Sequence, residues 1–200
     1  RQEGNMDKRH FLKLAGAGFA LAPVAAINKT NATDINGLSG LSDITANAKP
    51  ITVEERKARI EKAQSLMKAQ DIAAILVEPG AAMDYFSGIK WWRSERLTAL
   101  VIPQKGDMAV VTPFFEKPSV LESLAIGDDV RVWQEHESPF DVVANILKSR
   151  GITSGNIGFE SSVRYFVVTG VSRALPNINI VPAEPITVGC RMYKTAGELA

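Results

Sequence analysis

Histidine and cysteine are scarce in this 200-residue chain, which contains two histidines, His10 and His136, and one cysteine, Cys190. A zinc site of the usual Cys/His kind cannot be assembled from so few ligands. A single cysteine also excludes an intramolecular disulfide. An excess of either charge is lacking too: the formal net charge is +1, which gives no reason to expect nucleic acid as a partner. The composition therefore excludes more classes of function than it indicates.

Short motifs for catalysis or cofactor binding are also missing. No G-x-S-x-G nucleophile motif occurs, and Gly16-Ala17-Gly18 lacks the third glycine of a dinucleotide fingerprint. Against these absences, the chain has 46% hydrophobic and 22% charged residues, which are ordinary values for a globular protein. Its length fits one domain with appendages.

Residues 1–26 are predicted to be an export signal. Lys8, Arg9 and Lys13 precede an uncharged, mainly apolar run over residues 14–27, which is shorter than the roughly 17–25 residues that a membrane-spanning helix needs. Small residues at its end suit a signal-peptidase cut after Ala26. Residues 8–13 are similar to a twin-arginine signal with lysine in the first arginine's place. An ordinary secretory signal or an amphipathic N-terminal helix is the alternative. We expect a periplasmic or secreted protein without a stable membrane anchor.

Residues 27–50 are predicted to be a flexible spacer. They are rich in Asn, Thr, Ser, Gly and Asp and show neither a helical nor an alternating period. Without residues 1–26 the chain loses four basic and two acidic residues, so 19 basic and 20 acidic ones remain. The slight basicity of the chain therefore belongs to the predicted signal.

Helices and strands alternate over residues 51–190, the predicted domain. Thr52 and Glu55 form a capping box that starts a helix running to Gln70. Strands are predicted from short apolar or alternating runs, and two of them flank a five-residue turn at 103–107, which indicates a hairpin. The predicted strands are 73–77, 97–102, 108–112, 130–134, 156–160 and 178–181, and the further helices are 117–125, 140–150 and 163–175. This order predicts an α/β fold of three layers, α/β/α, with a mixed sheet.

The most unusual stretch is residues 85–96, predicted as a loop that leads into the hairpin. It carries Trp91, Trp92, Arg93 and Arg96. Tryptophan faces and arginine forks suit a peptide chain or a carboxylate, and loops on a rigid α/β scaffold are where binding residues gather. Alternatively, the tryptophans cap the hydrophobic core and the arginines pair with nearby acids. The residues alone leave both interpretations open.

Three other candidates favour structural interpretations. Glu135 and Glu137 point away from His136 in an extended chain, so a polar strand end is favoured over a metal site. Cys190 is predicted to be a buried, unreactive thiol, because only Arg191 is nearby to lower its pKa. Ser162 precedes a predicted helix and is expected to be its N-cap.

Three stretches, in this order, resemble the N-terminal domain of the creatinase/prolidase/aminopeptidase P family of pita-bread metallopeptidases. They are Met83-Asp84-Tyr85-Phe86-Ser87-Gly88 with the following Trp92 and Ser94-Glu95-Arg96, then Trp133 to Pro139, and finally Cys190-Arg191-Met192-Tyr193-Lys194-Thr195. The resemblance implies the creatinase/prolidase N-terminal-like fold with its ribonuclease H-like motif. It also implies that residues 191–200 open a linker helix to a catalytic domain that this chain lacks.

The resemblance carries expectations about function. In that family a C-terminal domain holds a dinuclear metal, often manganese, and we expect no metal ligand and no catalytic residue in this chain. The N-terminal domain of family members helps to build a dimer or tetramer and covers the active site, which restricts access to short peptides. The loop from Trp91 to Arg96 would reach that cleft, where Trp92 would line the substrate end and Arg93 or Arg96 would hold a carboxylate.

The leading interpretation is thus the non-catalytic N-terminal domain of an exported Xaa-Pro aminopeptidase or prolidase-like metallopeptidase, present as a fragment. Its expected partners are its own catalytic domain, further copies of the chain and, in the full-length protein, a short peptide. The alternatives are an exported binding module that reuses the fold, and the N-terminal part of a creatinase-like or other non-peptidase enzyme of the same family.

Overall fold

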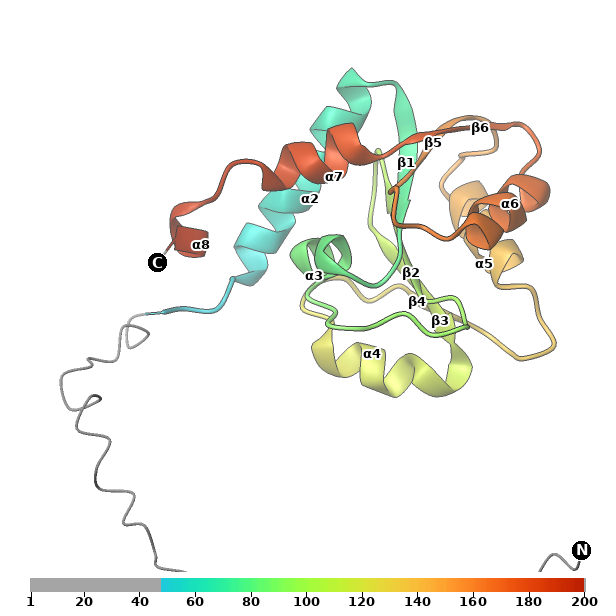
Figure 1. Ribbon diagram of the computed structural model, residues 1–200, viewed down its shortest axis with the longest axis horizontal. Helices are drawn as coiled ribbons and strands as arrows, with labels where there is room; N and C mark the ends of the chain where they lie inside the picture. Colours follow the sequence, from blue (N-terminus) through green and yellow to red (C-terminus); the bar gives the residue numbers. More distant parts are fainter. Residues whose placement is uncertain (1–47, 200) are drawn as a thin grey trace, which may run out of the picture. The chain divides into compact units, whose positions relative to one another are not determined.

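A mixed sheet of six strands lies at the centre of residues 48–199, the part of the chain that the computed structural model describes (Figure 1). The predicted export signal and most of the predicted spacer lie outside the described residues. The strands are β1 (Ile72–Val77), β2 (Ala99–Pro103), β3 (Ala109–Pro113), β4 (Val130–Trp133), β5 (Gly155–Phe159) and β6 (Ile178–Pro182).

The strand order is β4-β3-β2-β1-β5-β6. β2 is antiparallel to both of its neighbours, β1 and β3, whereas the other three pairs are parallel. Five strands therefore run in one direction and β2 alone runs in the other. As a result, the carboxyl ends of these five strands and the start of β2 share one edge of the sheet, and the candidate site lies at that edge.

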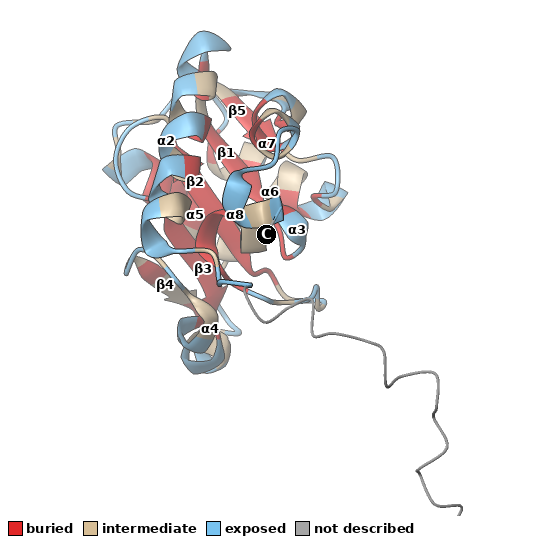
Figure 2. Ribbon diagram, turned by 90° about the vertical axis from the view of Figure 1, so that its left-hand side faces the viewer, coloured by how far each residue is buried: buried red, intermediate tan, exposed pale blue. Residues whose placement is uncertain are grey.

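Helices cover both faces of the sheet (Figures 1 and 2). One buried cluster joins α5 and α6 to one face, and a second joins α2, α3, α4 and α7 to the other. The predicted three-layer α/β/α fold with a mixed sheet is confirmed. The helices are α2 (Val53–Ala69), α3 (Ala81–Ser87), η1 (Phe114–Glu116), α4 (Lys117–Ser123), α5 (Pro139–Ser149), α6 (Tyr165–Ala174), α7 (Glu184–Arg191) and α8 (Ala196–Leu199).

Local sequence signals fix several of these elements. The Thr52 hydroxyl accepts a hydrogen bond of 3.1 Å from the Glu55 amide, so the predicted cap of α2 is confirmed. Ser138 caps α5 in the same way, and Pro139 occupies its first turn. β2 and β3 form the predicted antiparallel hairpin, with Val101 paired to Ala109.

Two short α-helices, α3 and α7, and the single turn η1 were not predicted from the sequence. Residues 81–87 form α3, so the start of the predicted loop is helical, and residues 184–191 form α7. Cys190 and Arg191 therefore end a helix of the domain rather than open the linker helix. The prediction that Ser162 caps a helix from residue 163 is wrong, because α6 begins at Tyr165 and the Ser162 hydroxyl donates instead to Glu160, at 2.9 Å.

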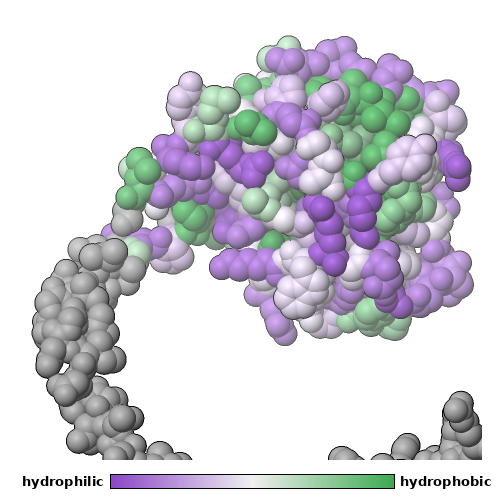
Figure 3. Space-filling view, viewed as in Figure 1, coloured by the Kyte–Doolittle hydropathy of each residue, from purple (hydrophilic) through white to green (hydrophobic). Residues whose placement is uncertain are grey.

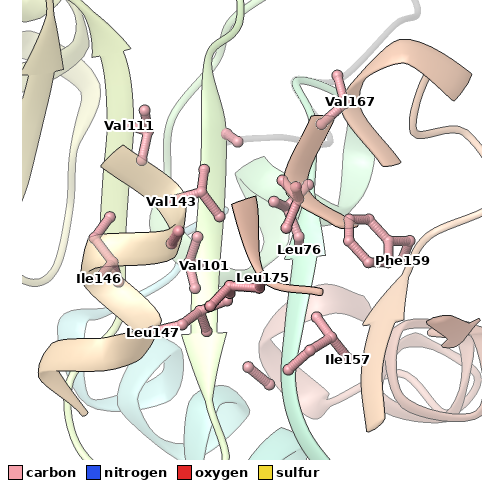
Figure 4. Packing of buried hydrophobic residues seen from close by; sticks show 14 of the residues in the cluster. Leu76, Val101, Val111, Val143, Ile146, Leu147, Ile157, Phe159, Val167 and Leu175 are labelled. Atoms are coloured by element: carbon pink, nitrogen blue, oxygen red, sulfur yellow. The ribbon is translucent and has the colours of Figure 1, made fainter. Parts of the chain in front are cut away.

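The cluster beneath α5 and α6 is made mainly of aliphatic side chains, together with Trp133 and Phe159, that pack on one face of the sheet (Figure 4). Leu76 of β1 and Ile157 of β5 are each 1% exposed, and both pack in this cluster. Burying an aliphatic side chain of this size contributes about 1.5–3 kcal/mol. The face seen in Figure 3 is mainly hydrophilic, with apolar patches between the polar side chains.

The last described residues attach to α2 through charged side chains. Arg59, which is buried, contacts Glu55 at 2.7 Å and Glu198 of α8 at 3.0 Å. Thr195 donates to the Glu55 carboxylate at 2.9 Å, and Glu198 in turn accepts from the Thr195 amide, which caps α8. α8 consequently lies beside the start of α2 (Figure 1).

These contacts shift the pKa of Glu55. Burial by itself raises that pKa, but hydrogen bonds from Arg59 and Thr195 and the charges of Arg59 and Arg56 outweigh it, so the pKa of Glu55 lies below its usual value.

No helix among residues 48–199 is long and apolar enough to span a bilayer.

Replacing a core isoleucine tests the packing. Ile157→Ala should lower the free energy of unfolding by about 2–5 kcal/mol, because it empties a fully buried site. The matched control is Ile180→Ala, since Ile180 is paired with Ile157 in the neighbouring strand but is 48% exposed; it should cost about 1 kcal/mol or less. Urea unfolding measures both, and equal losses would contradict the assigned core.

Glu55→Gln tests the attachment of α8. A carboxyl whose pKa is lowered in the folded state stabilises the fold above its unfolded pKa, and this stabilisation is lost as the pH falls through the folded pKa. We therefore expect Glu55→Gln to destabilise the protein at pH 7 and to differ progressively less from the wild type towards pH 3. Glu54→Gln, one residue earlier and exposed, is the control. A pH-independent difference in urea midpoint would contradict the assigned role of the Glu55 charge.

Candidate functional site

The candidate site is built on the edge of the sheet where five strands end and β2 begins. Residues 88–98 connect α3 to β2 along this edge, and they contain all four side chains predicted to bind substrate. The segments that follow the other strands also reach the same edge. Among them are Phe114 and Phe115 after β3, Glu135 after β4 and Glu160 after β5.

Trp91 and Trp92 stack on each other but have different surroundings. Their rings are 5.7 Å apart and nearly parallel, at 4°. Trp91 is half-buried and packs against the core cluster, whereas Trp92 is 76% exposed. The core-capping interpretation therefore holds for Trp91 and not for Trp92. Both rings border a hollow of about 350 Å³ that is also lined by Asp84 and Lys90.

Arg93 is exposed and makes no ion pair or side-chain hydrogen bond with any residue in 48–199. It lines a pocket of about 290 Å³ together with Glu160, Glu184 and Arg191. The two carboxylates already have partners, because the Ser161 amide donates to Glu184 at 2.6 Å and Arg191 lies 3.5 Å from Glu160. The guanidinium of Arg93 is thus free to bind an incoming carboxylate or carbonyl group.

Arg96 is engaged within the protein. Its guanidinium donates to Glu135 at 2.8 Å, also pairs with Glu95, and lies 5.3 Å from the centre of the Phe115 ring. The hydrogen bond to Glu135 raises the pKa of Arg96 above its usual value. The interpretation that the arginines pair with nearby acids therefore fits Arg96, and Arg93 is the better placed of the two to contact a ligand.

An ion pair between a buried carboxylate, Glu78, and the partly exposed Arg164 was missed by the sequence analysis. Glu78 follows β1 and is completely buried, and its carboxylate accepts from Arg164 at 2.9 Å (Nε), 2.6 Å (Nη2) and 2.7 Å (backbone N–H). The same guanidinium donates to the backbone carbonyl groups of Ser94 and Arg96. One signal was available in the sequence, namely an acidic residue directly after a fully apolar strand.

The other candidate residues take structural roles. Glu137 accepts from the Gln134 amide at 2.8 Å, and Glu135 pairs with Arg96, so these two side chains serve a turn after β4. Within residues 48–199 no group of three or more His, Cys, Asp or Glu side chains is arranged to hold a metal ion. Cys190 is buried, as predicted, and that burial raises the pKa of its thiol.

Comparison with known proteins identifies the domain. Residues 59–193 match the family model of the creatinase/prolidase N-terminal domain. The chain is 28% identical over 113 residues to the probable dipeptidase PepE of Mycobacterium tuberculosis. This match covers 56% of this chain and 26% of that protein.

Solved structures agree with this assignment. The dipeptidase PepE from Mycobacterium ulcerans is 29% identical with a TM-score of 0.65, over 72% of this chain and 38% of that one. The N-terminal domain of Xaa-Pro dipeptidase from Lactobacillus brevis shares the fold at 16% identity and a TM-score of 0.60, over 68% of this chain and 99% of that one. The chain thus spans well under half the length of the PepE dipeptidases it matches, and almost all of an isolated N-terminal domain. It belongs to the creatinase/prolidase N-terminal domain family.

Proposed function

We propose that this chain is the accessory N-terminal domain of an exported Xaa-Pro aminopeptidase or prolidase-like metallopeptidase. Its role is to help build a homo-oligomer and to cover an active site that lies in another part of the protein. The observation that carries the proposal is the consecutive pair Trp92 and Arg93, an exposed indole followed by a guanidinium that has no ion pair or side-chain hydrogen bond within residues 48–199. The backbone of their loop is held by Arg164, the partner of the buried Glu78.

The chemistry of these two side chains suits a short peptide. An exposed indole offers a flat apolar face to a proline ring or another side chain, and a free guanidinium offers two parallel donors to a terminal carboxylate. Both groups lie on a connecting loop at an edge of the sheet, so they would approach a substrate from outside the domain. Such contacts orient a substrate and limit its length, but they supply neither a nucleophile nor a general base.

The proposed catalytic metals would be bound elsewhere. Relatives named as dipeptidases extend well beyond the matched region, and the dinuclear centre expected from the family, with manganese as the expected metal, would belong to that further region. The described residues do not fit such a centre, because no three His, Cys, Asp or Glu side chains among them are arranged to hold a metal ion, and Glu78, Glu55 and Asp129 each pair with an arginine. We derive no catalytic step from them.

Export is the second part of the proposal. Its support is the basic stretch, apolar run and small residues within residues 1–26. Mass spectrometry of the N-terminus of the protein recovered from the periplasm or medium of the producing cell should find Ile27 as the first residue. Recovery of the uncleaved chain from the cytoplasm alone would overturn this part of the proposal.

The absence of catalysis is directly testable. We expect the 200-residue chain, with added manganese or cobalt, to release no N-terminal residue from an Xaa-Pro peptide. Reading the gene beyond Ala200 is the companion test: an open frame with two aspartates, a histidine and two glutamates as metal ligands supports the proposal. Metal-dependent turnover by this chain would contradict it, and a stop codon after Ala200 would favour a stand-alone binding module.

Arg93→Gln tests the substrate contact in a protein that carries both the domain and the catalytic region. If Arg93 holds the substrate carboxylate, KM should rise by about tenfold, equivalent to ~1.4 kcal/mol, while kcat changes little. A substrate with an amidated C-terminus should lose this difference. Arg173→Gln, which removes an exposed arginine from α6, is the control. An unchanged KM for the free-acid peptide would remove Arg93 from the site.

A further inference from the structure

We propose that Glu78 and Arg164 are positioning residues that hold the loop of residues 91–96 in the conformation that presents Trp92 and Arg93. The loop would then be organised before any ligand binds. The functional consequence rests on the proposed function, whereas the structural claim about the loop does not.

Glu78 is the fixed point of this arrangement. It is completely buried at the end of β1, a strand with neighbours on both sides, so its carboxylate has little freedom to move. Both carboxylate oxygens accept from Arg164, one from the side chain and the other from the backbone N–H. Because a buried charge without a partner is strongly unfavourable, Glu78 confines the Arg164 guanidinium to one orientation.

Arg164 connects Glu78 to the loop through hydrogen bonds. Two of its remaining N–H groups donate to backbone carbonyl groups, that of Ser94 through Nη1 and that of Arg96 through Nη2, at 3.3 Å. The Phe166 ring lies 4.7 Å from the guanidinium carbon. A planar guanidinium can reach a carboxylate and two carbonyl groups at once, whereas a lysine ammonium on a flexible stem cannot reproduce this fixed geometry.

The rest of the loop is held mainly at its ends. The Ser87 carbonyl accepts from the Ala125 amide at 2.8 Å before the loop, and the Leu97 carbonyl accepts from the Trp133 indole at 3.0 Å after it. Between these points the local hydrogen bonds are those of the Ile89 amide with the Ser87 hydroxyl and of the Ser94 hydroxyl with the amide and carbonyl groups of Arg96. Ile89 and Trp91 pack in the core cluster, and the Arg96 side chain pairs with Glu135. Arg164 is the contact from outside the loop that holds the backbone carbonyl group of Ser94, next to Arg93.

Arg164→Lys is the decisive variant, because it keeps a positive charge beside Glu78 but removes the donors to the loop. The stacked indoles of Trp91 and Trp92 should give an exciton couplet in the circular dichroism of the 200-residue chain, and Trp92→Phe identifies it by abolishing it. In Arg164→Lys we expect this couplet to be lost and acrylamide quenching of Trp91 to increase. Arg173→Gln, in α6, the helix that follows Arg164, should retain the wild-type spectrum.

A purely structural role for the pair predicts something else. In that case Arg164→Lys lowers the unfolding midpoint but leaves the couplet and the quenching of the folded protein unchanged, which would overturn the proposal. If Arg164→Lys does not fold, Glu78→Gln/Arg164→Met decides, since it removes both charges together. Loss of the couplet in that folded variant supports the proposal, and its retention overturns it.

The effect of the loop conformation on substrate binding is measured in a separate kinetic experiment. In a protein that also carries the catalytic region, Arg164→Lys should raise KM for the peptide and leave kcat nearly unchanged, as Arg93→Gln does. A lost couplet with an unchanged KM would retain the positioning role but contradict the proposed substrate contact. A retained couplet would contradict the positioning role whatever the kinetics show.

Discussion

The arrangement of the site depends on one ion pair, that of the buried Glu78 with Arg164. A carboxylate with no exposed surface at the end of a central strand requires a charged partner, and the partner it has is long enough to continue past it to the loop. The need to neutralise Glu78 therefore determines where the backbone of Ser94 and Arg96 lies. The same requirement places Arg164 at the start of α6, since its backbone N–H also donates to Glu78.

The topology of the sheet makes this contact possible. Because β2 alone runs against the other five strands, it begins at the edge of the sheet where β1, β3 and β5 end. The segment that connects α3 to β2 therefore lies along this edge, and it carries both tryptophans. The helices on the two faces enclose the core (Figure 2). Trp92 and Arg93 are exposed in the loop at this edge of the sheet.

The sequence predicted what short-range signals determine. The cap at Thr52, the start of α5 at Pro139 and the hairpin between β2 and β3 each depend on residues within a few positions, and the structure confirms them. α3 and α7 were missed because each buries only a few side chains in seven or eight residues, too few for a clear helical period. For the site, the residue types indicated that the loop binds a ligand. They did not show that Arg96 has ion-pair partners within residues 48–199 whereas Arg93 has none. Arg96 meets Glu135, and Glu78 meets Arg164, only through tertiary contacts between distant segments, 39 and 86 residues apart.

The central claim is that this domain presents Trp92 to a peptide held in another part of the protein. Site-specific photo-cross-linking from position 92, in a protein that includes the catalytic region, measures this contact directly. The account predicts an adduct with a bound Xaa-Pro peptide, competed by unlabelled substrate, and none from position 193, where the native tyrosine is equally exposed at 76%. Equal labelling from both positions, or none from position 92, would contradict it.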